Sequence, residues 1–575
     1  MACPHAQETD INDNQPDPAL PDASWWPPEL PRHLTIPQTS VYCNLEVSAA
    51  RFPDKPCTIF YGGHLTYREL WRQTEHLAGF LQNDCGVAAG DRVAVYMQNS
   101  PQWVMAFYAI LRCGAVVVPV NPMNRTDELR HVLQDSGASI LLAAQDLLAF
   151  ASPLLGDNRE SVLQHIVVAT YSDYIDPDTD LRMPAAVSEP RLTDAGPRAA
   201  RWHDVMALAR VPGALVADVD DLCVMPYTSG TTGRPKGCAH SHRSVMTTLV
   251  GGVQWFARTQ DAVYLSALPF FHVTGLTGSM NGPIFAGATM VILARWDREV
   301  AALYMERYRV TVWQAITTML IDFLAHPGLH AVDLRSLGVV RGGGAAMPEA
   351  VAAKLKARTG LDYVEGYGLS ETMAAVMINP PRRPKPQCLG VPLFDVEACI
   401  VEPGTLRALP AGEVGELLVH APQVMREYWR NEQATREALV AIDGKTFLRT
   451  GDLVRVDDDG YYFMVDRLKR MVNVSGYKVW PAEVETMMYA HPEVQEVCVV
   501  GATDAEHGEL VKAYVVLKTE RDKTPTAQDV VAWTRDHMAA YKCPRVVEFV
   551  SGLPKSSSGK VMWRELQAGT VVPDR

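Results

Sequence analysis

The chain has no excess of basic residues. Among its 575 residues, Lys and Arg number 53 and Asp and Glu number 66, which gives a formal net charge of −13. Surfaces that bind nucleic-acid phosphates are strongly basic, so this balance argues against a nucleic-acid partner. It still allows a local basic pocket for a small anion.

Long apolar runs, a leader segment and paired cysteine motifs are also missing. The nearest candidate for a membrane helix, residues 138–155, is interrupted by Gln145, Asp146 and Pro153, whereas a span needs roughly 18 to 20 apolar residues. No basic segment followed by an apolar one begins the chain, as a secretory signal would. Eleven cysteines occur without any CxxC, which disfavours a zinc knuckle or a disulfide framework. We expect a cytoplasmic protein with reduced thiols and no integral membrane segment.

The length and texture predict more than one folding unit. A chain of 575 residues is too long for one compact core, and 47% hydrophobic with 21% charged residues is ordinary for folded proteins. Residues 1–35 are rich in Pro and Asp and contain Trp25 and Trp26, so we expect an extended arm whose aromatic residues dock on the body.

The pattern of residues 91–144 predicts a parallel, helix-covered sheet. Apolar strands and amphipathic helices alternate there as βαβαβ. The expected elements are strands 92–97, 115–118 and 139–143 and helices 101–113 and 126–134. Residues 150–210 are weakly patterned and rich in Asp, Arg and Pro, which predicts surface connections.

Later segments predict two smaller units. Between about 385 and 465, short strands separated by Gly and Asp turns indicate a β module. From about residue 468, short strands and helices at 482–490 and 527–538 indicate a separate α+β domain of about 100 residues. The predicted fold class is α/β, with doubly wound sheets, a small β module and a smaller α+β C-terminal domain.

The run from Tyr227 to Gly237 carries the sharpest chemical signal. It follows an apolar strand at 222–226 and precedes a helix from Ser244, so we expect a strand-to-helix turn. Glycines let the backbone curl around an oxyanion, hydroxyls and N–H groups bind it, and a lysine adds charge. The candidate phosphate-binding residues are Thr228, Ser229, Gly230, Thr231, Thr232, Gly233 and Lys236. The spacing differs from GxxxxGK[ST], so a kinase-type P-loop is excluded.

Four further positions have two interpretations each. Glu371 ends a Gly-rich segment, where it would bind Mg²⁺ together with phosphate oxygens, or begin a helix. Asp452 follows a Thr-Gly turn, where it would accept ribose hydroxyls or cap the turn, and Arg467 would contact the nucleotide or form a surface ion pair. His272, among aromatic residues, indicates a pocket wall and not a base, because a carboxylic acid is already ionised at pH 7.

The Tyr227–Gly237 run resembles the phosphate loop of the adenylate-forming (AMP-binding) superfamily, in its acyl-CoA synthetase branch. Seven more segments resemble that family's motifs in the same order, and the resemblance spans residues 52–564. They are 268–275, 342–348, 365–372, 449–452, 466–469, 474–478 and 553–560. The resemblance implies a large domain at 36–466 and a mobile C-terminal domain at 467–575, with the hinge at Lys469.

The resemblance also implies two half-reactions, with ATP, Mg²⁺ and coenzyme A. Catalytic roles fall to Lys560, Thr228, Glu371 and His272, and Lys560 would bridge the reacting carboxylate and phosphate. ATP and AMP would further contact Gly343, Gly344, Ala345, Glu365, Gly366, Tyr367, Gly368, Ser370, Asp452 and Arg467. The acyl pocket would comprise His272, Thr274, Met280, Gly344, Tyr367, Met373 and Ala374. The coenzyme A channel would comprise Ser475, Gly476, Tyr477 and Lys478, and Glu371 would hold the metal.

The acid itself is less sharply specified. The hinge sequence Asp466-Arg467-Leu468-Lys469 resembles the luciferase, coumarate-ligase and fatty-acyl branch, and the N-terminal segment resembles bacterial long-chain fatty-acid CoA ligases. The expected pocket is mainly apolar and holds no cation for a second carboxylate. We therefore expect a medium- or long-chain fatty acid. An aryl-acid ligase, an acyl-AMP ligase that loads a carrier-protein thiol, and an inactive nucleotide-binding scaffold are the alternatives. A homodimer stays open.

Overall fold

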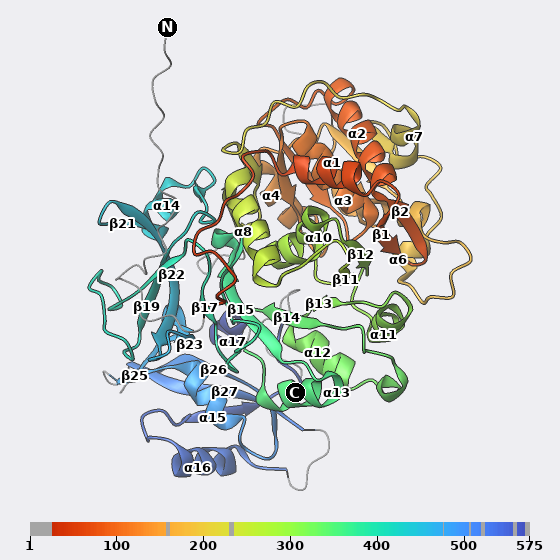
Figure 1. Ribbon diagram of the computed structural model, residues 1–575. Coiled ribbons are helices and arrows are strands. Elements are labelled where there is room, and N and C mark those ends of the chain that lie inside the picture. Colours follow the sequence, from red (N-terminus) through yellow and green to blue (C-terminus); the bar gives the residue numbers. More distant parts are fainter. Residues whose placement is uncertain are drawn as a thin grey trace.

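The computed structural model describes residues 26–156, 162–228, 235–344, 346–474, 477–504, 508–518, 524–555 and 561–569. The described residues form two large sheets that are mostly parallel and two smaller sheets. Figure 1 shows the large sheets and their helices in the upper part of the molecule and the C-terminal elements, in blue, below them. The expected α/β class is confirmed.

The first large sheet has a parallel centre and antiparallel edges. Its strands, in spatial order, are β17 (Val391–Pro392), β16 (Ala374–Ile378), β15 (Tyr363–Leu369), β14 (Val339–Gly343), β13 (Val312–Gln314), β11 (Val263–Ser266), β12 (Thr289–Ile292), β1 (Pro56–Phe60) and β2 (Gly63–Thr66). Pairing is parallel from β15 through to β1. The pairs β15–β16, β16–β17 and β1–β2 are antiparallel.

The second large sheet contains the βαβαβ unit that the sequence predicts. Its strands, in spatial order, are β20 (Glu427–Tyr428), β10 (Lys236–Ser241), β8 (Leu222–Val224), β4 (Val116–Pro119), β3 (Arg92–Tyr96), β5 (Ile140–Ala144), β6 (His165–Ala169) and β7 (Ala199–Arg201), with β9 (Tyr227–Thr228) paired to β10. The helices α3 (Pro101–Arg112) and α4 (Thr126–Ser136) connect β3, β4 and β5, which pair in parallel. These bounds lie within two residues of the predicted ones.

The interpretation of residues 150–210 as surface connections is wrong for residues 165–169 and 199–207, whereas most of residues 175–198 do form connections without helix or strand. This stretch contributes β6 and β7, which extend the sheet in parallel beyond β5. Four of the five residues of β6 are buried. A short continuous apolar run is typical of a buried parallel strand, and the Asp-, Arg- and Pro-rich flanks concealed it.

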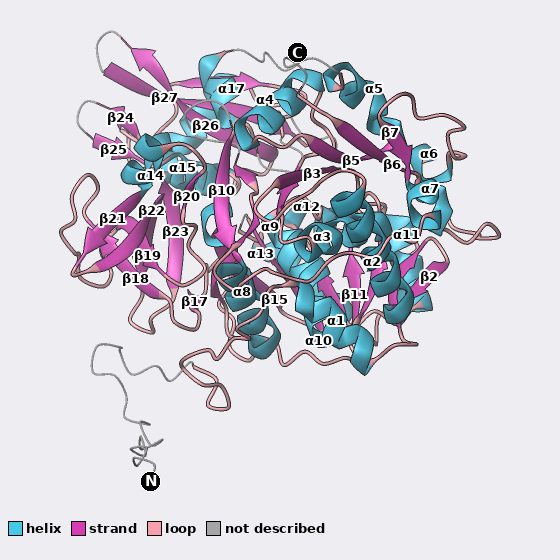
Figure 2. Cartoon of the chain, turned by 90° about the horizontal axis from the view of Figure 1, so that it is seen from above, coloured by secondary structure: helices cyan, strands magenta, loops and turns pink. Residues whose placement is uncertain are grey.

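Helices between the two large sheets bury the central core (Figure 2). The helix α2 (Tyr67–Asn83) contacts β1 and β2 of the first sheet, α3 contacts β3 and β4 of the second, and the two helices pack on each other, with α1 (Tyr42–Arg51) beside them. Eleven of the twelve residues of α3 are buried, as expected for a helix covered on all sides. Ser100 caps α3 and a Thr66–Glu69 capping box begins α2, so both helices start at defined positions.

Further helices complete the two layers and connect the strands. They are α5 (Leu148–Ala151), α6 (Ala185–Ser188), α7 (Trp202–Ala207), α8 (His242–Trp255), α9 (Val273–Gly275), the π-helical turn η4 (Leu276–Asn281), α10 (Gly282–Ala286), α11 (Arg298–Arg307), α12 (Thr317–Leu324), α13 (Glu349–Thr359) and α14 (Glu432–Ala438). Across the described residues, no helix is both long and apolar enough to cross a membrane.

The predicted β module is an antiparallel sheet that shares a core with the first large sheet. It contains β18 (Glu397–Val401), β19 (Gly415–His420), β22 (Lys445–Val456), β21 (Leu439–Ile442) and β23 (Tyr462–Arg467). Trp26 belongs to that core, with its ring centroid 5.3 Å from that of Trp255 and 5.2 Å from that of Phe394. Docking of the N-terminal arm is therefore confirmed for Trp26, whereas Trp25 lies outside the described residues.

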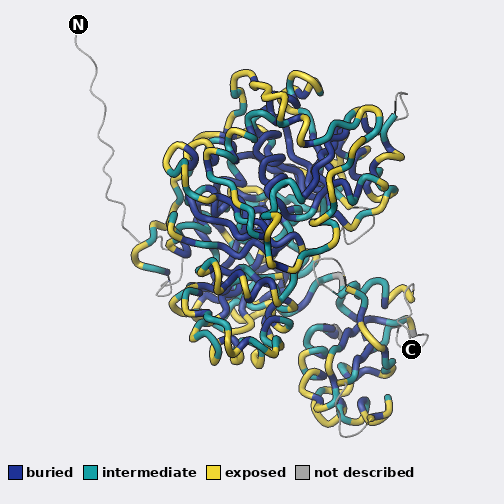
Figure 3. Tube along the Cα trace, turned by 90° about the vertical axis from the view of Figure 1, so that its right-hand side faces the viewer, coloured by how far each residue is buried: buried dark blue, intermediate teal, exposed yellow. Residues whose placement is uncertain are grey.

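The C-terminal elements form a lobe with buried residues of its own (Figure 3). Its sheet contains β25 (Tyr477–Val479), β24 (Val472–Val474), β27 (Gly508–Leu517), β26 (Val494–Asp504) and β28 (Val546–Phe549), and its helices are α15 (Pro481–Met488), α16 (Ala527–His537) and α17 (Trp563–Ala568). Two hydrophobic clusters are built wholly from residues of this lobe. The exact domain boundary stays a prediction.

Candidate active site

One large cavity, about 1620 Å³ in volume, lies at the carboxyl ends of parallel strands from both large sheets. On the side of the second sheet it is lined by residues that follow β3 and β4, among them Asn99 and Asn121. The first sheet contributes residues at the ends of β11, β13 and β14, among them Leu268, Ile316 and Gly343. Ligands of α/β proteins bind at such edges. This cavity is therefore the candidate active site.

Asp452 and Arg467, predicted from separate motifs, form an ion pair. They are opposite each other on β22 and β23, with Arg467 Nε 2.9 Å from Asp452 Oδ1. The Tyr367 hydroxyl donates to Asp452 Oδ2 at 2.6 Å. Asp452 has no exposed surface, and its charge raises the pKa of the Arg467 guanidinium above the ordinary value. Arg467 and Tyr367 line the cavity, whereas Asp452 is not among the lining residues and orients both side chains through these contacts.

A tyrosine connects the predicted phosphate-binding lysine with the predicted metal ligand. Lys236 Nζ lies 3.9 Å from the ring centroid of Tyr428, and the Tyr428 hydroxyl donates to Glu371 Oε1 at 2.6 Å. All three residues line the cavity, as does Thr228. Burial, followed by the Glu371 charge, raises the pKa of Tyr428, so the hydroxyl keeps its proton. Sequence reasoning missed Tyr428, because only the β10–β20 pairing brings it near Lys236.

A buried histidine ties the same strand to the Glu371 segment. The ring of His240, on β10, places Nε2 2.7 Å from the backbone carbonyl oxygen of Ser370. Burial lowers the pKa of His240 to about 4, so the ring is neutral near pH 7 and Nε2–H donates to that carbonyl. This contact fixes Ser370, which lines the cavity.

The predicted phosphate loop connects two antiparallel strands. Thr228 pairs with Lys236 and Tyr227 with Gly237, so the loop closes the β9–β10 hairpin. The expectation of a strand-to-helix turn is wrong, since β10 separates the loop from α8. Of the predicted loop residues, Thr228 and Lys236 line the cavity, and residues 229–234 lie outside the described part of the chain.

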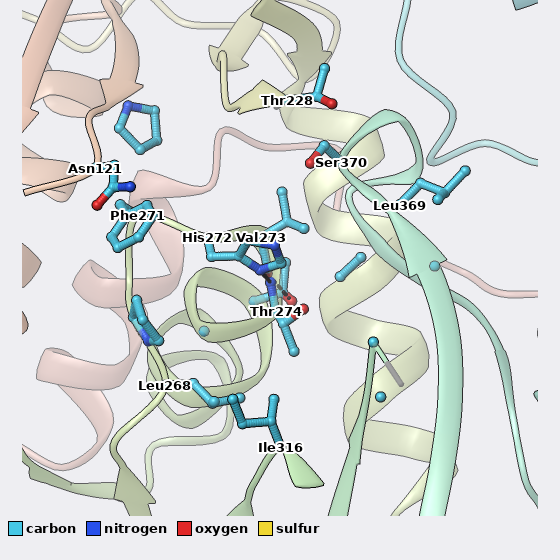
Figure 4. A pocket seen from close by; sticks show the side chains of 18 of the residues that line it. Asn121, Thr228, Leu268, Phe271, His272, Val273, Thr274, Ile316, Leu369 and Ser370 are labelled. Carbon is cyan, nitrogen blue, oxygen red and sulfur yellow. Dashed lines mark hydrogen bonds between the residues drawn. The ribbon is translucent and has the colours of Figure 1, made fainter. Parts of the chain in front are cut away.

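His272 begins the short helix α9 in the cavity wall. Its Nδ1 accepts the backbone N–H of Thr274 at 3.3 Å. Figure 4 shows His272 and Thr274 in the middle of the wall, below Thr228 and Ser370. His272 thus has the wall position expected for it, and the hydrogen bond orients its ring.

Five of the seven predicted acyl-pocket residues line the cavity: His272, Thr274, Gly344, Tyr367 and Ala374. Met280 and Met373 do not, because both are fully buried in the main hydrophobic core. Thr274, Gly278 and Gly282 face the cavity at helical spacing, which turns Met280 to the opposite face. The placement of both methionines in the pocket is therefore wrong.

The predicted nucleotide-binding segments around the strand ends have mixed outcomes. Gly343, Gly344, Gly366, Gly368 and Ser370 line the cavity. Glu365 does not: its Oε1 accepts the backbone N–H groups of Met347, at 3.4 Å, and Gln387, at 3.1 Å. Burial raises the pKa of Glu365 from 4.5 to about 7. Its side chain ties the Gly-rich turn to the segment after β16. Ala345 lies outside the described residues.

The C-terminal lobe also contributes to the cavity. Lys555 lines it, as do the five residues 561–565, and Arg467, at the end of β23, and Leu468 line it before the lobe begins. Lys555 and Val561 form an antiparallel bridge, and Lys560 belongs to the stretch 556–560 between them, outside the described residues. Both ends of the predicted catalytic loop are therefore at the cavity.

The predicted coenzyme A channel is described only in part. Backbone pairing between β24 and β25 forms a hairpin in the C-terminal lobe. Ser475 and Gly476 lie outside the described residues, and of Tyr477 and Lys478 the structure describes the backbone alone. The hinge residue Lys469 belongs to the turn Leu468–Arg470.

Several cations that line the cavity were missed by sequence reasoning, among them Arg125, Arg295 and Arg341. Arg341, on β14, lines the cavity. Arg341 is therefore a cavity cation that the expected acyl pocket does not include. The sequence did contain a signal for Arg341. The run Val339–Gly343 otherwise consists of valines and glycines, so a charged residue within it is unusual. No cluster of three or more metal-type side chains occurs among the described residues.

Two family models match the chain. The model of the AMP-binding enzyme matches residues 45–429, and the model of the AMP-binding enzyme C-terminal domain matches residues 483–560. The first match includes both large sheets, and the second falls within the C-terminal lobe.

Named relatives match over nearly the whole chain. A long-chain-fatty-acid–CoA ligase of Bacillus subtilis (strain 168) is 33% identical over 550 residues, which cover 94% of this chain and 96% of the relative. A feruloyl-CoA synthase of Amycolatopsis sp is 33% identical over 524 residues, covering 91% and 97%.

One protein with solved structures in two states, ATP-bound and apo, is similar to this chain in both. ATP-bound MatB from Rhodopseudomonas palustris has a TM-score of 0.80 at 27% identity, covering 93% of this chain and 99% of MatB. The apo structure of MatB, at the same identity and coverage, has a TM-score of 0.71. The arrangement of this chain is therefore more similar to the ATP-bound state.

The raised pKa of Glu365 predicts a pH-dependent stability. Between pH 4.5 and 7 the carboxyl group ionises in the unfolded chain but stays protonated in the fold, so the free energy of unfolding falls as pH rises. The difference between the two pKa values corresponds to a change in the free energy of unfolding on the order of 3 kcal/mol. Glu365→Gln keeps an acceptor oxygen and cannot ionise. The variant should therefore gain stability relative to the wild type between pH 5 and pH 8.

Urea unfolding at both pH values measures this difference. Glu349→Gln, at an exposed glutamate, is the matched control for loss of one carboxylate. A stability difference between Glu365→Gln and wild type that does not change with pH would contradict the assignment.

Proposed function

The chain belongs to the AMP-binding enzyme family, and from that premise we propose how its residues divide the work of an AMP-forming acyl-CoA synthetase. The enzyme activates a carboxylic acid with ATP and transfers the acyl group to coenzyme A. The observation that carries the proposal is that one cavity is lined by the phosphate-loop flanks, the Ser370 segment, the His272 wall and both ends of the Lys560 loop.

The reaction proceeds in two transfers. First, a carboxylate oxygen of the acid attacks the α-phosphorus of ATP, the bond to the oxygen bridging to the β-phosphorus breaks, and pyrophosphate leaves. Then the thiol sulfur of coenzyme A attacks the carbonyl carbon of the acyl-AMP, the bond to the AMP oxygen breaks, and AMP leaves while the thiol proton passes to solvent.

We assign the nucleotide to the side of the cavity formed by Lys236, Tyr367 and Arg467. The β- and γ-phosphates would lie against Thr228 and Lys236, at the hairpin ends. Arg467 and the Tyr367 hydroxyl, both held by Asp452, would flank the ribose. Lys560 would contact the reacting carboxylate and the α-phosphate together, which lowers the repulsion between two anions and holds them in line.

Glu371 fits a Mg²⁺ ion accompanying ATP. Mg²⁺ takes one or two carboxylates and completes its shell with phosphate oxygens and waters. Glu371 lines the cavity near Lys236, and the Tyr428 hydroxyl occupies only its Oε1. A bound Mg²⁺ would neutralise phosphate charge. The chain's own contribution is to orient this carboxylate through Tyr428.

The acid would occupy the part of the cavity between His272 and β14. Apolar residues such as Leu249, Val253, Leu268 and Ile316 line the cavity there, which suits an extended aliphatic acid. We therefore favour a medium- or long-chain acid, in line with the Bacillus relative. The feruloyl-CoA synthase relative, at equal identity, keeps an aryl acid as the second candidate. A carrier-protein thiol as acceptor is the remaining alternative to coenzyme A.

We propose that the described arrangement is the one for the first transfer. Its similarity to the ATP-bound state of MatB and the lining of the cavity by Lys555 and Val561 both support this. For the second transfer, the C-terminal domain, residues 467–575, would turn about Lys469 relative to residues 36–466, so that the β24–β25 hairpin replaces the Lys560 loop. Such hinge motions often limit turnover. A cytoplasmic location and a homodimer stay predictions.

Variants of the two C-terminal loops should separate the half-reactions. Lys560→Ala should lower acid-dependent pyrophosphate release by about 10²- to 10³-fold, because the reacting anions lose their shared cation. It should still form thioester from supplied acyl-AMP. Gly476→Leu should do the reverse, because a side chain at that position would obstruct the thiol path.

Pyrophosphate release and thioester formation are measured separately for each variant. Lys555→Ala removes a lysine at the end of the same loop, where it pairs with Glu496 at 2.6 Å, and should cause a much smaller loss. Equal loss of both half-reactions in Lys560→Ala and Gly476→Leu would contradict the division of roles.

Tyr428→Phe tests the orientation of Glu371. The variant keeps the ring beneath Lys236 and removes the hydroxyl that donates to Glu371. A hydrogen bond to a charged group contributes about 1.5 to 3 kcal/mol, and part of this should appear as a roughly 3- to 10-fold higher KM for Mg·ATP. Titration of Mg²⁺ at fixed ATP measures it. Tyr428→Leu, which also removes the ring, should bind Mg·ATP more weakly still. Wild-type affinity for Mg·ATP in both variants would contradict the role of Tyr428 in orienting Glu371.

A further inference from the structure

Arg341 is a cation of the cavity without a matching anion. Its guanidinium carbon lies 4.3 Å from the ring centroid of Phe256, and Nη2 donates weakly to the carbonyl of Gly278 at 3.4 Å. The Nε atom is buried and has no hydrogen-bond partner. No described carboxylate forms an ion pair with Arg341. The side chain therefore retains unused hydrogen-bonding capacity at the cavity.

Three other arginines with little-exposed side chains form ion pairs. The ion pairs are Arg112–Glu75, Arg449–Glu416 and Arg470–Glu485. Arg341 differs from all three. Leaving a buried charge unpaired is unfavourable, so an arginine kept in that state needs a reason that the folded chain alone does not supply.

A second arginine, Arg258, lies near Arg341. Burial is the largest cause lowering the pKa of Arg341; Tyr264 acts in the opposite direction, and the nearby Arg258 lowers the pKa further. Arg258 Nε donates to the carbonyl of Phe256 at 2.5 Å and forms no ion pair with a described carboxylate. Perturbed charges of this kind are typical of ligand-binding sites. The local field would therefore attract an anion.

The position of Arg341 is at the inner end of the acyl region. Gly344 is three positions further along the chain, so the Cα of Arg341 lies on the order of 10 Å from that turn, at about 3.3 Å per residue. Tyr264 and Gln314, on the neighbouring strands β11 and β13, also line the cavity. A tyrosine hydroxyl and an amide can each donate a hydrogen bond. The side chains of Arg341, Tyr264 and Gln314 therefore make this end of the cavity polar, and we call them its polar floor.

We propose that Arg341, with Tyr264 and Gln314, binds a second carboxylate at the far end of the acid. The preferred substrates are then aliphatic α,ω-dicarboxylates of medium length, with one end adenylated and the other held at the floor. This inference rests on the proposed acid activation and narrows its substrate class. The apolar walls between the two ends suit the methylene chain.

The test compares matched acids on the wild-type enzyme. Pyrophosphate release and thioester formation are measured with hexanoate, octanoate, decanoate and dodecanoate and with the dicarboxylate of each length. At least one dicarboxylate should have a kcat/KM roughly 10-fold or more above that of its partner. Faster turnover of every monocarboxylate would overturn the inference. Absence of acid-dependent pyrophosphate release with any acid, including aryl acids, would instead overturn the proposed function.

Variants then assign the effect to Arg341. Arg341→Met keeps the length of the side chain and should lower kcat/KM for the dicarboxylate roughly 100-fold, mainly through KM, because a buried carboxylate loses its partner. Monocarboxylate turnover should be unchanged or faster. Arg341→Lys should restore part of the dicarboxylate preference.

Arg258→Met is the matched control, since Arg258 does not line the cavity and its loss should affect both classes of acid equally. A parallel loss for both classes in Arg341→Met would show that the residue only supports the Gly278 turn, and would overturn the inference. If Arg341→Met does not fold, the wild-type comparison and Arg341→Lys decide alone.

Discussion

The meeting of parallel strand ends from two sheets at one cavity is the constraint on which the rest of the structure depends. Backbone polar groups at the carboxyl ends of strands, and the loops that follow them, are the natural place for ligands in α/β folds. Here β3 and β4 open on the cavity from one side and β11, β13 and β14 from the other. Two reactants can therefore be held against each other by loops whose positions are fixed by separate buried sheets.

The electrostatics of the cavity follow from an acidic chain that must bind anions. With a formal charge of −13, the protein does not attract ATP or an acid by its overall field. Individual cations are held in different ways. Lys236 lies on the Tyr428 ring, Arg467 is paired with Asp452, and Arg341 forms no ion pair with any carboxylate among the described residues. A lysine on an aromatic ring keeps its charge free for phosphate, whereas Arg467 is oriented by its partner.

Much of the fold and part of the site could be predicted from sequence, for identifiable reasons. The βαβαβ unit and the helices of the C-terminal domain have strong periodicity, and their bounds were nearly right. The hairpin at Thr228 and Lys236 was missed because a two-residue strand has no periodicity to detect. Tyr428 and the two methionines depend on tertiary pairing and on helix phase, which local motifs do not contain. Arg341 was visible as a charge within a run of apolar residues and glycines.

The central claim is that the acid oxygen forms a bond to the α-phosphorus of ATP within this cavity. The most direct measurement uses an acid labelled with ¹⁸O in both carboxylate oxygens, together with ATP and coenzyme A, and mass spectrometry of the products. The account predicts one ¹⁸O in the AMP formed at each turnover and one in the thioester carbonyl. Unlabelled AMP, or label in inorganic phosphate with formation of ADP, would contradict it.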